Sequence, residues 1–466
     1  MAVEVGVKLY AHQTEGARRL MANPRYALWW EMGTGKTATV LDAIRRCVEN
    51  PNINLPPRYD WRALIVCPLA IIDSAWRRDA ETFAPGLTFT GFHDRRPDIP
   101  FGQATLNVVN FESFRARFRR TFQSKIPRYD MLVIDESSKL KAFNSQTSKI
   151  MRHYAQTIER VVLLSGTPAP NDGLEYWSQM YCIDQKILGH SFYGFRYAFG
   201  KPERIYAPGA RVVDKWRADP DKTPLMLERI ATVSHTLRKE DCLDLPDRVD
   251  QTIAVELSPT ERKAYDTMKR DLILRFGPGC NDVAAAVNVL AEIMKLRQLC
   301  NGWTYDVNHE AQPTGGSKLR ALDELLEGIP NEPVIIWVEY REDAARLLEH
   351  FGPRATRLIG GMSNTERVKA ILEFQTGKRQ YLIAHPASAG HGLTFVNASY
   401  AVFYGLGYSY ELHKQAKDRI HRIGQTRKCT YYYLLAADTI EQKILGIVRD
   451  KEDAAEVAMG YLRNGD

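Results

Sequence analysis

Residues 29 to 41, WWEMGTGKTATVL, combine the residue types that can hold a phosphate group. Gly33 and Gly35 allow the backbone to turn so that its N–H groups face an anion. Lys36 supplies a positive charge, and the Thr37 hydroxyl is suited to bind Mg²⁺. An apolar run precedes the turn, and an apolar stripe with helical spacing follows it. The segment therefore predicts a strand, a phosphate-binding loop and a helix.

The loop departs from the full eight-residue P-loop pattern in one place. Trp29 and Trp30 stand near the position of the first glycine. A chance occurrence of G-x-G-K-T is the alternative interpretation, but the strand before it and the helix after it favour a phosphate site.

An acidic pair, Asp135 and Glu136, follows the apolar run MLVI. At the carboxyl end of a strand an aspartate can hold Mg²⁺, and an adjacent glutamate can polarise an attacking water. By itself the pair is equally well explained as the N-cap of a helix. Together with Lys36 it predicts hydrolytic phosphoryl transfer.

Two further segments could serve the same chemistry. LLSGTPAPN, 163 to 171, is at least a tight turn after a strand, and its position after Asp135 suggests a coupling loop. QAKDRIHRIGQ places Gln415, Arg419 and Arg422 at spacings of four and three. On a helix these three share one face, and the guanidinium groups could reach a γ-phosphate across a cleft. The alternative is a salt-bridged surface helix.

The elements that must position these residues alternate between strands and helices. Short apolar runs at 63–67, 105–109, 131–135 and 161–165 predict a first parallel sheet, and runs at 334–338, 381–384, 400–404 and 430–435 predict a second. We therefore expect an α/β protein with two parallel-sheet lobes and helical insertions between them. The expected domains are a first lobe at 1–240 with a helical and irregular insertion at 172–235, a helical insertion and linker at 241–332, a second lobe at 333–450, and a C-terminal tail at 451–466.

Composition sets outer limits on function. The 466 residues carry a net charge of +7, which permits a polyanionic partner without requiring one. The segment SFRARFRR, 113 to 120, interleaves aromatic and basic residues, although a solvated face explains it as well. No apolar run reaches the roughly 18 residues that span a bilayer, so we expect no membrane association. The seven cysteines form no C-x-x-C pair, which argues against a zinc ribbon or a disulfide framework.

The ordered segments LYAHQTEG, EMGTGKT, LIVCPLAIIDSAW, NFESF, IDESS, LLSGTPAPN, LRKEDCLDLP, MKLRQLCNG, GMSNTER, SAGHGLTF and QAKDRIHRIGQ resemble the motif series of superfamily-two helicases, in the branch of SWI/SNF-related DNA translocases. The resemblance covers residues 9 to about 445. DRIHRIGQ is highly specific to that branch, whereas GTGKT and SGTP are shared across the superfamily. The resemblance implies two RecA-like lobes, ATP and Mg²⁺ in the cleft between them, and duplex DNA bound along one strand's backbone.

The resemblance also implies roles for individual residues. Gln13 matches the adenine-reading glutamine, and Gly33, Thr34, Gly35, Lys36 and Thr37 match the phosphate loop, with Thr37 and Asp135 as Mg²⁺ ligands. Lys36, Asp135, Glu136, Gln415, Arg419 and Arg422 match the catalytic set, in which Gln415 lies near the catalytic water and the two arginines are arginine fingers. The residues matched to DNA binding or to its coupling with hydrolysis are Asn110, Ser165, Thr167, Gly390 and Gly392.

Three departures from the family pattern stand out. The acidic box is DESS where DEAH or DEGH is usual, so Ser138 replaces a histidine that couples hydrolysis to the neighbouring motif. AGHGLTF lacks the usual Gly-Gly and Asn, and GYSYE stands where WNP is usual. We expect hydrolysis to survive and its coupling to DNA to differ.

The resemblance favours an ATP-dependent motor on duplex DNA with little sequence specificity. A strand-separating helicase and a non-enzymatic DNA-binding adaptor are the alternatives; the first needs a wedge such as a β-hairpin, for which 195–224 shows no clear signature. We expect a minimal motor of bacterial or phage type, monomeric in its basic unit, in the cytoplasm of a bacterial cell or phage-infected host. The sequence identifies no protein partner.

Overall fold

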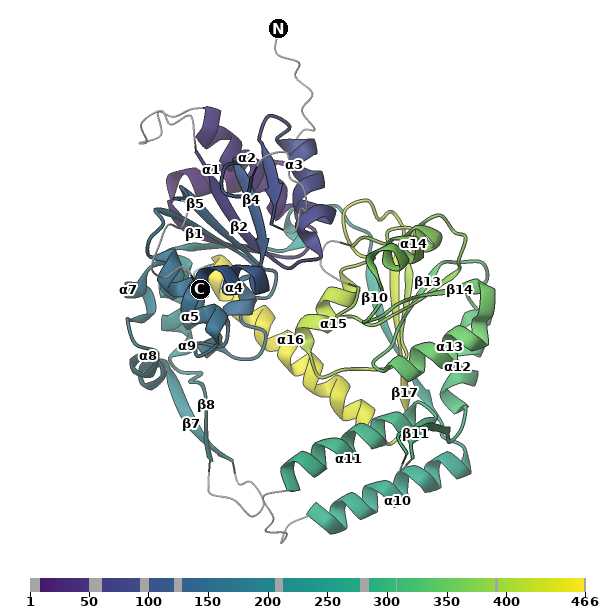
Figure 1. Ribbon diagram of the computed structural model, residues 1–466. Coiled ribbons are helices and arrows are strands. Elements are labelled where there is room, and N and C mark those ends of the chain that lie inside the picture. The colour runs from purple at the N-terminus through teal and green to yellow at the C-terminus, as the bar shows by residue number, and fades with distance from the viewer. Residues whose placement is uncertain are drawn as a thin grey trace.

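The computed structural model describes residues 9–49, 61–92, 100–120, 128–205, 213–276, 285–306, 308–389 and 393–464. These residues form two lobes, each built on a parallel sheet covered by helices (Figure 1). The two-lobe α/β prediction is therefore confirmed.

The first lobe contains a seven-stranded parallel sheet in the order β3-β4-β2-β5-β6-β1-β9. Its strands are β1 (Arg25–Trp30), β2 (Ala63–Cys67), β3 (Phe89–Gly91), β4 (Leu106–Asn110), β5 (Met131–Asp135), β6 (Arg160–Leu164) and β9 (Ser234–Leu237). Helices α1 (Ala11–Ala22), α2 (Lys36–Glu49), α3 (Arg78–Phe83), α4 (Phe111–Arg120) and α5 (Gln146–Ala155) connect most of them. The central strands are buried on both faces, which explains their continuous apolar runs.

The second lobe contains a six-stranded parallel sheet in the order β10-β17-β16-β13-β15-β14. Its strands are β10 (Arg248–Val255), β13 (Val334–Trp337), β14 (Ala355–Leu358), β15 (Tyr381–Ala384), β16 (Tyr400–Phe403) and β17 (Cys429–Ala436). Helices α12 (Ser317–Glu327), α13 (Arg341–Phe351), α14 (Asn364–Gln375) and α15 (Tyr410–Lys417) accompany them. Strand β10 lies inside the stretch that we expected to be a helical linker. Its sequence, RVDQTIAV, is half polar because it is an exposed edge strand, so it lacks a continuous apolar run.

Two insertions extend from this framework. The first contains α6 (Tyr176–Ile183), α7 (Gln185–Leu188), α8 (Phe192–Phe199), the antiparallel hairpin of β7 (Gly200–Ile205) and β8 (Val213–Ala218), and α9 (Thr223–Ala231). The second contains α10 (Pro259–Phe276), α11 (Ala285–Cys300) and the short pair β11 (Trp303–Tyr305) and β12 (Ala311–Pro313). The hairpin was not foreseen, because its strands mix charged residues with a proline and show no apolar alternation.

The last helix, α16 (Ile440–Asn464), ties the two lobes together. It begins beside β17 of the second lobe and runs back to the first lobe, where it lies against α9 and β9 (Figure 1). Leu462 near its end is buried in the first lobe's core. The stretch 451–466 that we expected as a tail is therefore, over its described residues, the continuation of a helix that bridges the lobes.

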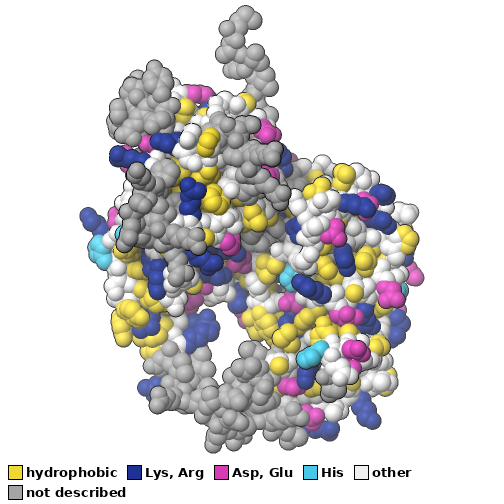
Figure 2. Space-filling view, viewed as in Figure 1, with side chains coloured by type: hydrophobic (Ala, Val, Ile, Leu, Met, Phe, Trp, Pro, Cys, Tyr) yellow, Lys and Arg dark blue, Asp and Glu magenta, His cyan; other side chains and the backbone are white. Residues whose placement is uncertain are grey.

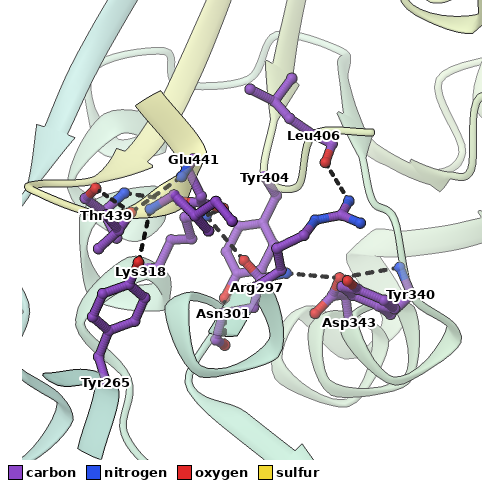
Figure 3. A network of polar contacts seen from close by, with 12 residues as sticks. Tyr265, Arg297, Asn301, Lys318, Tyr340, Asp343, Tyr404, Leu406, Thr439 and Glu441 are labelled. Atoms are coloured by element: carbon purple, nitrogen blue, oxygen red, sulfur yellow. Dashed lines mark hydrogen bonds and ion pairs between the residues drawn. The ribbon is translucent and has the colours of Figure 1, made fainter. Parts of the chain in front are cut away.

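A buried polar network fixes the second insertion to the second lobe (Figure 3). Lys318 on α12 donates hydrogen bonds to Glu441 of α16 at 2.6 Å and to Asn301 at 2.9 Å. Asn301 in turn donates to Asp343 at 3.0 Å, and burial raises the pKa of Asp343 to about 6. Arg297 of α11 donates to the Leu406 carbonyl, in the loop that leads into α15. The network thus sets the position of α15, which faces the first lobe.

None of the helices that the structure describes is long and apolar enough to cross a membrane.

Candidate nucleotide site between the lobes

The predicted phosphate loop lies at the carboxyl end of β1, and α2 begins at Lys36. Gly33 and Gly35 have φ angles of +83° and +85°, a conformation that favours glycine. A Cβ atom at Gly35 would lie 1.9 Å from the side-chain nitrogen of Gln13. The loop therefore needs glycine at both positions, for conformation and for space.

Lys36 is held inside the loop. Its ammonium group donates to the carbonyls of Trp30 at 2.8 Å and Glu31 at 3.0 Å. Burial lowers the pKa of Lys36, while the nearby carboxylates of Asp135 and Glu136 oppose that shift. The ammonium thus lies within electrostatic reach of the acidic pair.

Gln13 packs against the same loop. Its side-chain oxygen accepts a hydrogen bond from the Tyr10 N–H at 3.0 Å, and its nitrogen donates to the Thr34 carbonyl at 3.2 Å. Both ends of the amide are engaged within the chain, so the structure places Gln13 at the loop. Its contact with adenine stays a prediction.

The acidic pair emerges next to the coupling loop. Asp135 is opposite Leu164 in the β5–β6 register, so Glu136 and Ser165 leave the sheet side by side. The indole N–H of Trp76 donates to Asp135 at 2.9 Å. Glu136 has a φ angle of +65°, a left-handed conformation that is uncommon for non-glycine residues.

Two hydroxyls hold the Glu136 carboxylate. The Oγ atoms of Ser138 and Ser165 donate to the same Oε1 atom at 2.8 Å and 3.0 Å. The Thr167 N–H donates to Ser165 Oγ at 3.1 Å, so both predicted coupling residues join the acidic pair in one hydrogen-bonded unit.

Gln179 belongs to this unit, although sequence reasoning missed it. It accepts from the Ser137 hydroxyl at 2.7 Å and donates to the Pro168 carbonyl at 2.7 Å. It is fully buried on α6. A glutamine in the middle of an apolar helix, YWSQMYCI, was the available signal, because a buried amide needs partners.

The prediction that Gln415, Arg419 and Arg422 share one helical face is wrong for the two arginines. Helix α15 ends at Lys417, and residues 418–424 form turns that end at Gly424, with a φ angle of +97°. The N–H groups of Arg419 and Ile420 bond to carbonyls three residues earlier, so the α-helical spacing is lost here. The Asp418 side chain at this break pairs with Lys239.

The two arginines nevertheless converge. The Nη1 atoms of Arg419 and Arg422 donate to the same Leu393 carbonyl, at 3.2 Å and 3.1 Å. A Cβ atom at Gly33 would lie 3.1 Å from Cβ of Arg422, so the second lobe touches the phosphate loop here. Gln415 is buried on α15.

Arg419 has unused hydrogen-bonding capacity. The side chain is 3% exposed, and its Nε and Nη2 atoms have no hydrogen-bond partner among the described residues. Burial lowers the pKa of Arg419 to about 10, Arg422 adds to the shift, and Glu136 counters it. A buried guanidinium with open donors next to the acidic pair is suited to an anionic ligand.

Ion pairs across the cleft surround the site, and the sequence did not reveal them. Lys414 of α15 binds Glu31 of the phosphate loop at 2.8 Å, and the Lys239 N–H donates to Glu31 at 2.9 Å. Burial alone would raise the pKa of Glu31, but Lys414 and Lys239 together lower it to about 2. Residues far apart in sequence make these pairs, so no local charge pattern could predict them.

The predicted DNA residues are only partly placed by the structure. Asn110 ends β4 and is 7% exposed, with its amide donating to Glu112 at 2.7 Å. Gly390 and Gly392 lie outside the described residues. In SFRARFRR, now α4, the Arg117 guanidinium lies over the rings of Phe92 and Phe101, so part of this basic segment serves packing.

The protein alone supplies few metal ligands. Among the described residues no three His, Cys, Asp or Glu side chains cluster as a metal site. Mg²⁺ commonly binds through one or two protein oxygens together with substrate phosphates and water. Thr37, in the first turn of α2, and Asp135 are compatible with such a site.

Comparisons with known proteins give family matches for both lobes. The SNF2-related domain model matches residues 12–304, and the helicase conserved C-terminal domain model matches residues 317–424. A protein of Acyrthosiphon pisum secondary endosymbiont phage 1, putative protein p41, is 26% identical over 90% of this chain and 91% of its own. The putative ATP-dependent helicase/translocase YwqA of Bacillus subtilis is 25% identical over 91% of this chain but only 45% of its own length.

Among solved structures, the Sulfolobus solfataricus SWI2/SNF2 ATPase core in complex with dsDNA aligns over 98% of this chain and 95% of its own. Its sequence identity is 20% and the TM-score is 0.44. The SNF2-related model by itself covers well over half of the chain. The chain therefore belongs to the SNF2-related family of superfamily-two ATPases.

Proposed function

We propose that this protein is an ATP-dependent translocase on duplex DNA that binds ATP between its lobes. The carrying observation is the buried Arg419 guanidinium, whose open Nε and Nη2 donors belong to one lobe while the Lys36 and Glu136 side chains belong to the other. An anion bound among these residues would contact both lobes. Its hydrolysis would therefore change how the lobes are held together.

The chemistry that this arrangement supports is phosphoryl transfer to water. Lys36, Arg419 and Arg422 would stabilise charge on the transferring group, and Glu136 would orient the attacking water. Mg²⁺ bound by Thr37 and Asp135 would neutralise phosphate charge. All of these side chains are retained, which disfavours the non-enzymatic adaptor.

Duplex DNA is the proposed track. One SNF2 relative was solved as an ATPase core in complex with dsDNA, and family membership brings that partner to this chain as a proposal. Backbone contacts would give weak sequence preference and a steep salt dependence. We further propose a monomeric motor in the cytoplasm of a bacterial cell or phage-infected host, in line with the phage relative.

The test is phosphate release with and without duplex DNA at low salt, together with displacement of a triplex-forming strand from the duplex. We expect DNA to raise turnover at least several-fold, and triplex displacement to require ATP. Lys36→Ala is the matched inactive control. Equal turnover with and without DNA, or no triplex displacement, would reject the proposal.

A second candidate is strand separation, which the β7–β8 hairpin and the adjoining helix α8 favour. The Arg196 guanidinium lies 4.4 Å from the Trp216 ring centroid and 5.1 Å and 5.5 Å from those of Tyr193 and Tyr197. The two tyrosines are 57% and 64% exposed. Exposed rings beside cations are the groups on which single-stranded bases stack.

The charge around the hairpin fits the same ligand. Its strands carry four basic residues, Lys201, Arg204, Lys215 and Arg217, and two acidic residues, Glu203 and Asp214. The hairpin extends from the first lobe toward the α10–α11 pair (Figure 1), and the space-filling view is hollowed between the lobes at this level (Figure 2).

Release of a labelled strand from a forked duplex separates the two candidates. If the hairpin separates strands, Tyr193→Ala with Tyr197→Ala should abolish release and leave duplex-stimulated ATPase in place. Tyr305→Ala, an exposed ring on the other lobe, is the control. If the wild-type protein displaces the triplex-forming strand but releases no strand from the forked duplex, the result supports translocation without strand separation.

A further inference from the structure

The hydroxyl of Ser138 lies between two carboxylates that belong to different lobes. It is 2.8 Å from Oε1 of Glu136 and 3.4 Å from Oε1 of Glu411, the second residue of α15. All three side chains are buried, at 1%, 5% and 8% exposure. A serine hydroxyl has one proton, so it can donate a full hydrogen bond to only one of them.

The surroundings hold both carboxylates in place. Ser165 donates to the same Glu136 oxygen at 3.0 Å, so Glu136 keeps one donor whatever Ser138 does. Lys141 donates to the other oxygen of Glu411 at 3.1 Å, which offsets the repulsion between two carboxylates and turns Glu411 toward the first lobe. The second lobe therefore presents a competing acceptor directly to the hydroxyl that binds the catalytic glutamate.

A simpler explanation for Glu411 is its place in the first turn of α15, where acidic residues interact favourably with the helix dipole. That role is fulfilled equally well by an exposed side chain. It does not account for a buried carboxylate whose two oxygens contact Ser138 and Lys141 of the opposite lobe.

We propose that Glu411 is a positioning residue that controls how firmly the Glu136 carboxylate is held, through Ser138. The inference rests on the proposed function, in which Glu136 orients the attacking water. When Ser138 donates to Glu136, two hydroxyls hold the carboxylate in one orientation. When closure of the lobes brings Glu411 up, the Ser138 hydroxyl turns to Glu411, and the Glu136 carboxylate is released to turn toward the attacking water. No proton is transferred; the O–H group changes its acceptor.

The two obvious variants should act in opposite directions. Ser138→Ala removes the donor, so DNA-free ATPase should rise several-fold and stimulation by DNA should shrink. Glu411→Gln replaces a charged acceptor by a weaker neutral one, so DNA-stimulated kcat should fall about tenfold, the scale of one hydrogen bond to a charged group. KM for ATP should not change in either, because neither side chain is placed at the phosphates.

A double-variant cycle tests the connection itself. In the Ser138→Ala background, Glu411→Gln should have no further effect on kcat. In the Ser165→Ala background it should retain its full effect, since Ser165 contacts Glu136 but not Glu411. Lys141→Met changes a partly exposed residue and is the alternative if Glu411→Gln folds poorly. It should lower DNA-stimulated kcat when Ser138 is present and should have no such effect in the Ser138→Ala background.

The outcomes separate the inference from the function on which it rests. Two results would overturn the role of Glu411. One is that the effects of Ser138→Ala and Glu411→Gln on kcat are independent. The other is that DNA-stimulated kcat is unchanged in both Glu411→Gln and Lys141→Met. A wild type that duplex DNA does not stimulate would instead reject the proposed function.

Discussion

Lys239→Met should destabilise the protein strongly, because it leaves a buried carboxylate without its partner. Lys239 and Asp418 are each 5% exposed and form an ion pair across the two lobes. Lys239 also donates to the His421 carbonyl at 2.9 Å, while Oδ2 of Asp418 has no hydrogen-bond partner among the described residues. Lys36, Arg419 and Arg422 also attract Asp418 electrostatically, while Lys239 supplies the direct contact with its carboxylate.

The magnitude follows from this burial. Removing one member of a buried pair costs about 3–5 kcal/mol, whereas replacing both by apolar residues is often neutral or stabilising. With a urea slope of about 3 kcal/mol per molar, the single variant should lower the unfolding midpoint by about 1 M or more. The double variant Lys239→Met with Asp418→Leu should recover most of that loss.

Urea unfolding followed by far-ultraviolet circular dichroism measures the effect. Because two lobes need not unfold in one step, each transition is compared separately. Lys222→Met is the control, since Lys222 is 48% exposed and its pair with Asp219 spans 3.9 Å, so the midpoint should hardly move. The reasoning would be refuted if the urea midpoint of Lys239→Met were unchanged. It would also be refuted if the double variant were as unstable as the single variant, because the unpaired Asp418 carboxylate would then not be the cause.

Three further predictions concern the site and its surroundings. Lys36→Ala should weaken binding of a fluorescent ATP analogue and abolish turnover, whereas Glu136→Gln should bind ATP and not hydrolyse it; wild-type turnover in Glu136→Gln would remove Glu136 from its assigned role. Arg422→Ala should lower DNA-stimulated ATPase by about 10² or more without changing DNA affinity in the absence of nucleotide, and Arg422→Lys should not rescue it; an equal loss of DNA affinity would contradict the finger assignment. Burial lowers the pKa of His413 to about 3, so the stability it contributes is complete above its unfolded pKa near 6.5 and is lost as the pH falls toward 3. Between pH 7.5 and 5.0 the free energy of urea unfolding should therefore fall less in His413→Gln than in the wild type. Equal decreases in the two proteins would refute the lowered pKa of His413.

The fold was largely predictable because parallel strands covered on both faces are continuous apolar runs. All eight runs identified in the sequence are strands of the two sheets, with ends within one residue. Several strands escaped prediction, among them β10 and the β7–β8 hairpin. These are exposed on at least one side, so polar residues interrupt their apolar pattern.

The chemistry was predictable where its residues are contiguous. The phosphate loop and the acidic pair each sit within a few residues of a strand end, so local order places them at one edge of the sheet. The arginines show the limit of this reasoning. Their spacing suggested one helical face, but α15 ends at Lys417. The shared Leu393 carbonyl brings Arg419 and Arg422 together instead.

The sequence by itself determined the α/β class, the two sheets and the identities of the groups that can bind phosphate, because these depend on periodicity and short spacings. Only the tertiary structure decided which charges meet across the cleft. Ser138 and Glu411 are 273 residues apart, and Lys239 and Asp418 are 179 apart. Contacts over such separations depend on how two independently formed cores dock, and α16 and the ion pairs of the cleft set that docking. No local pattern encodes it.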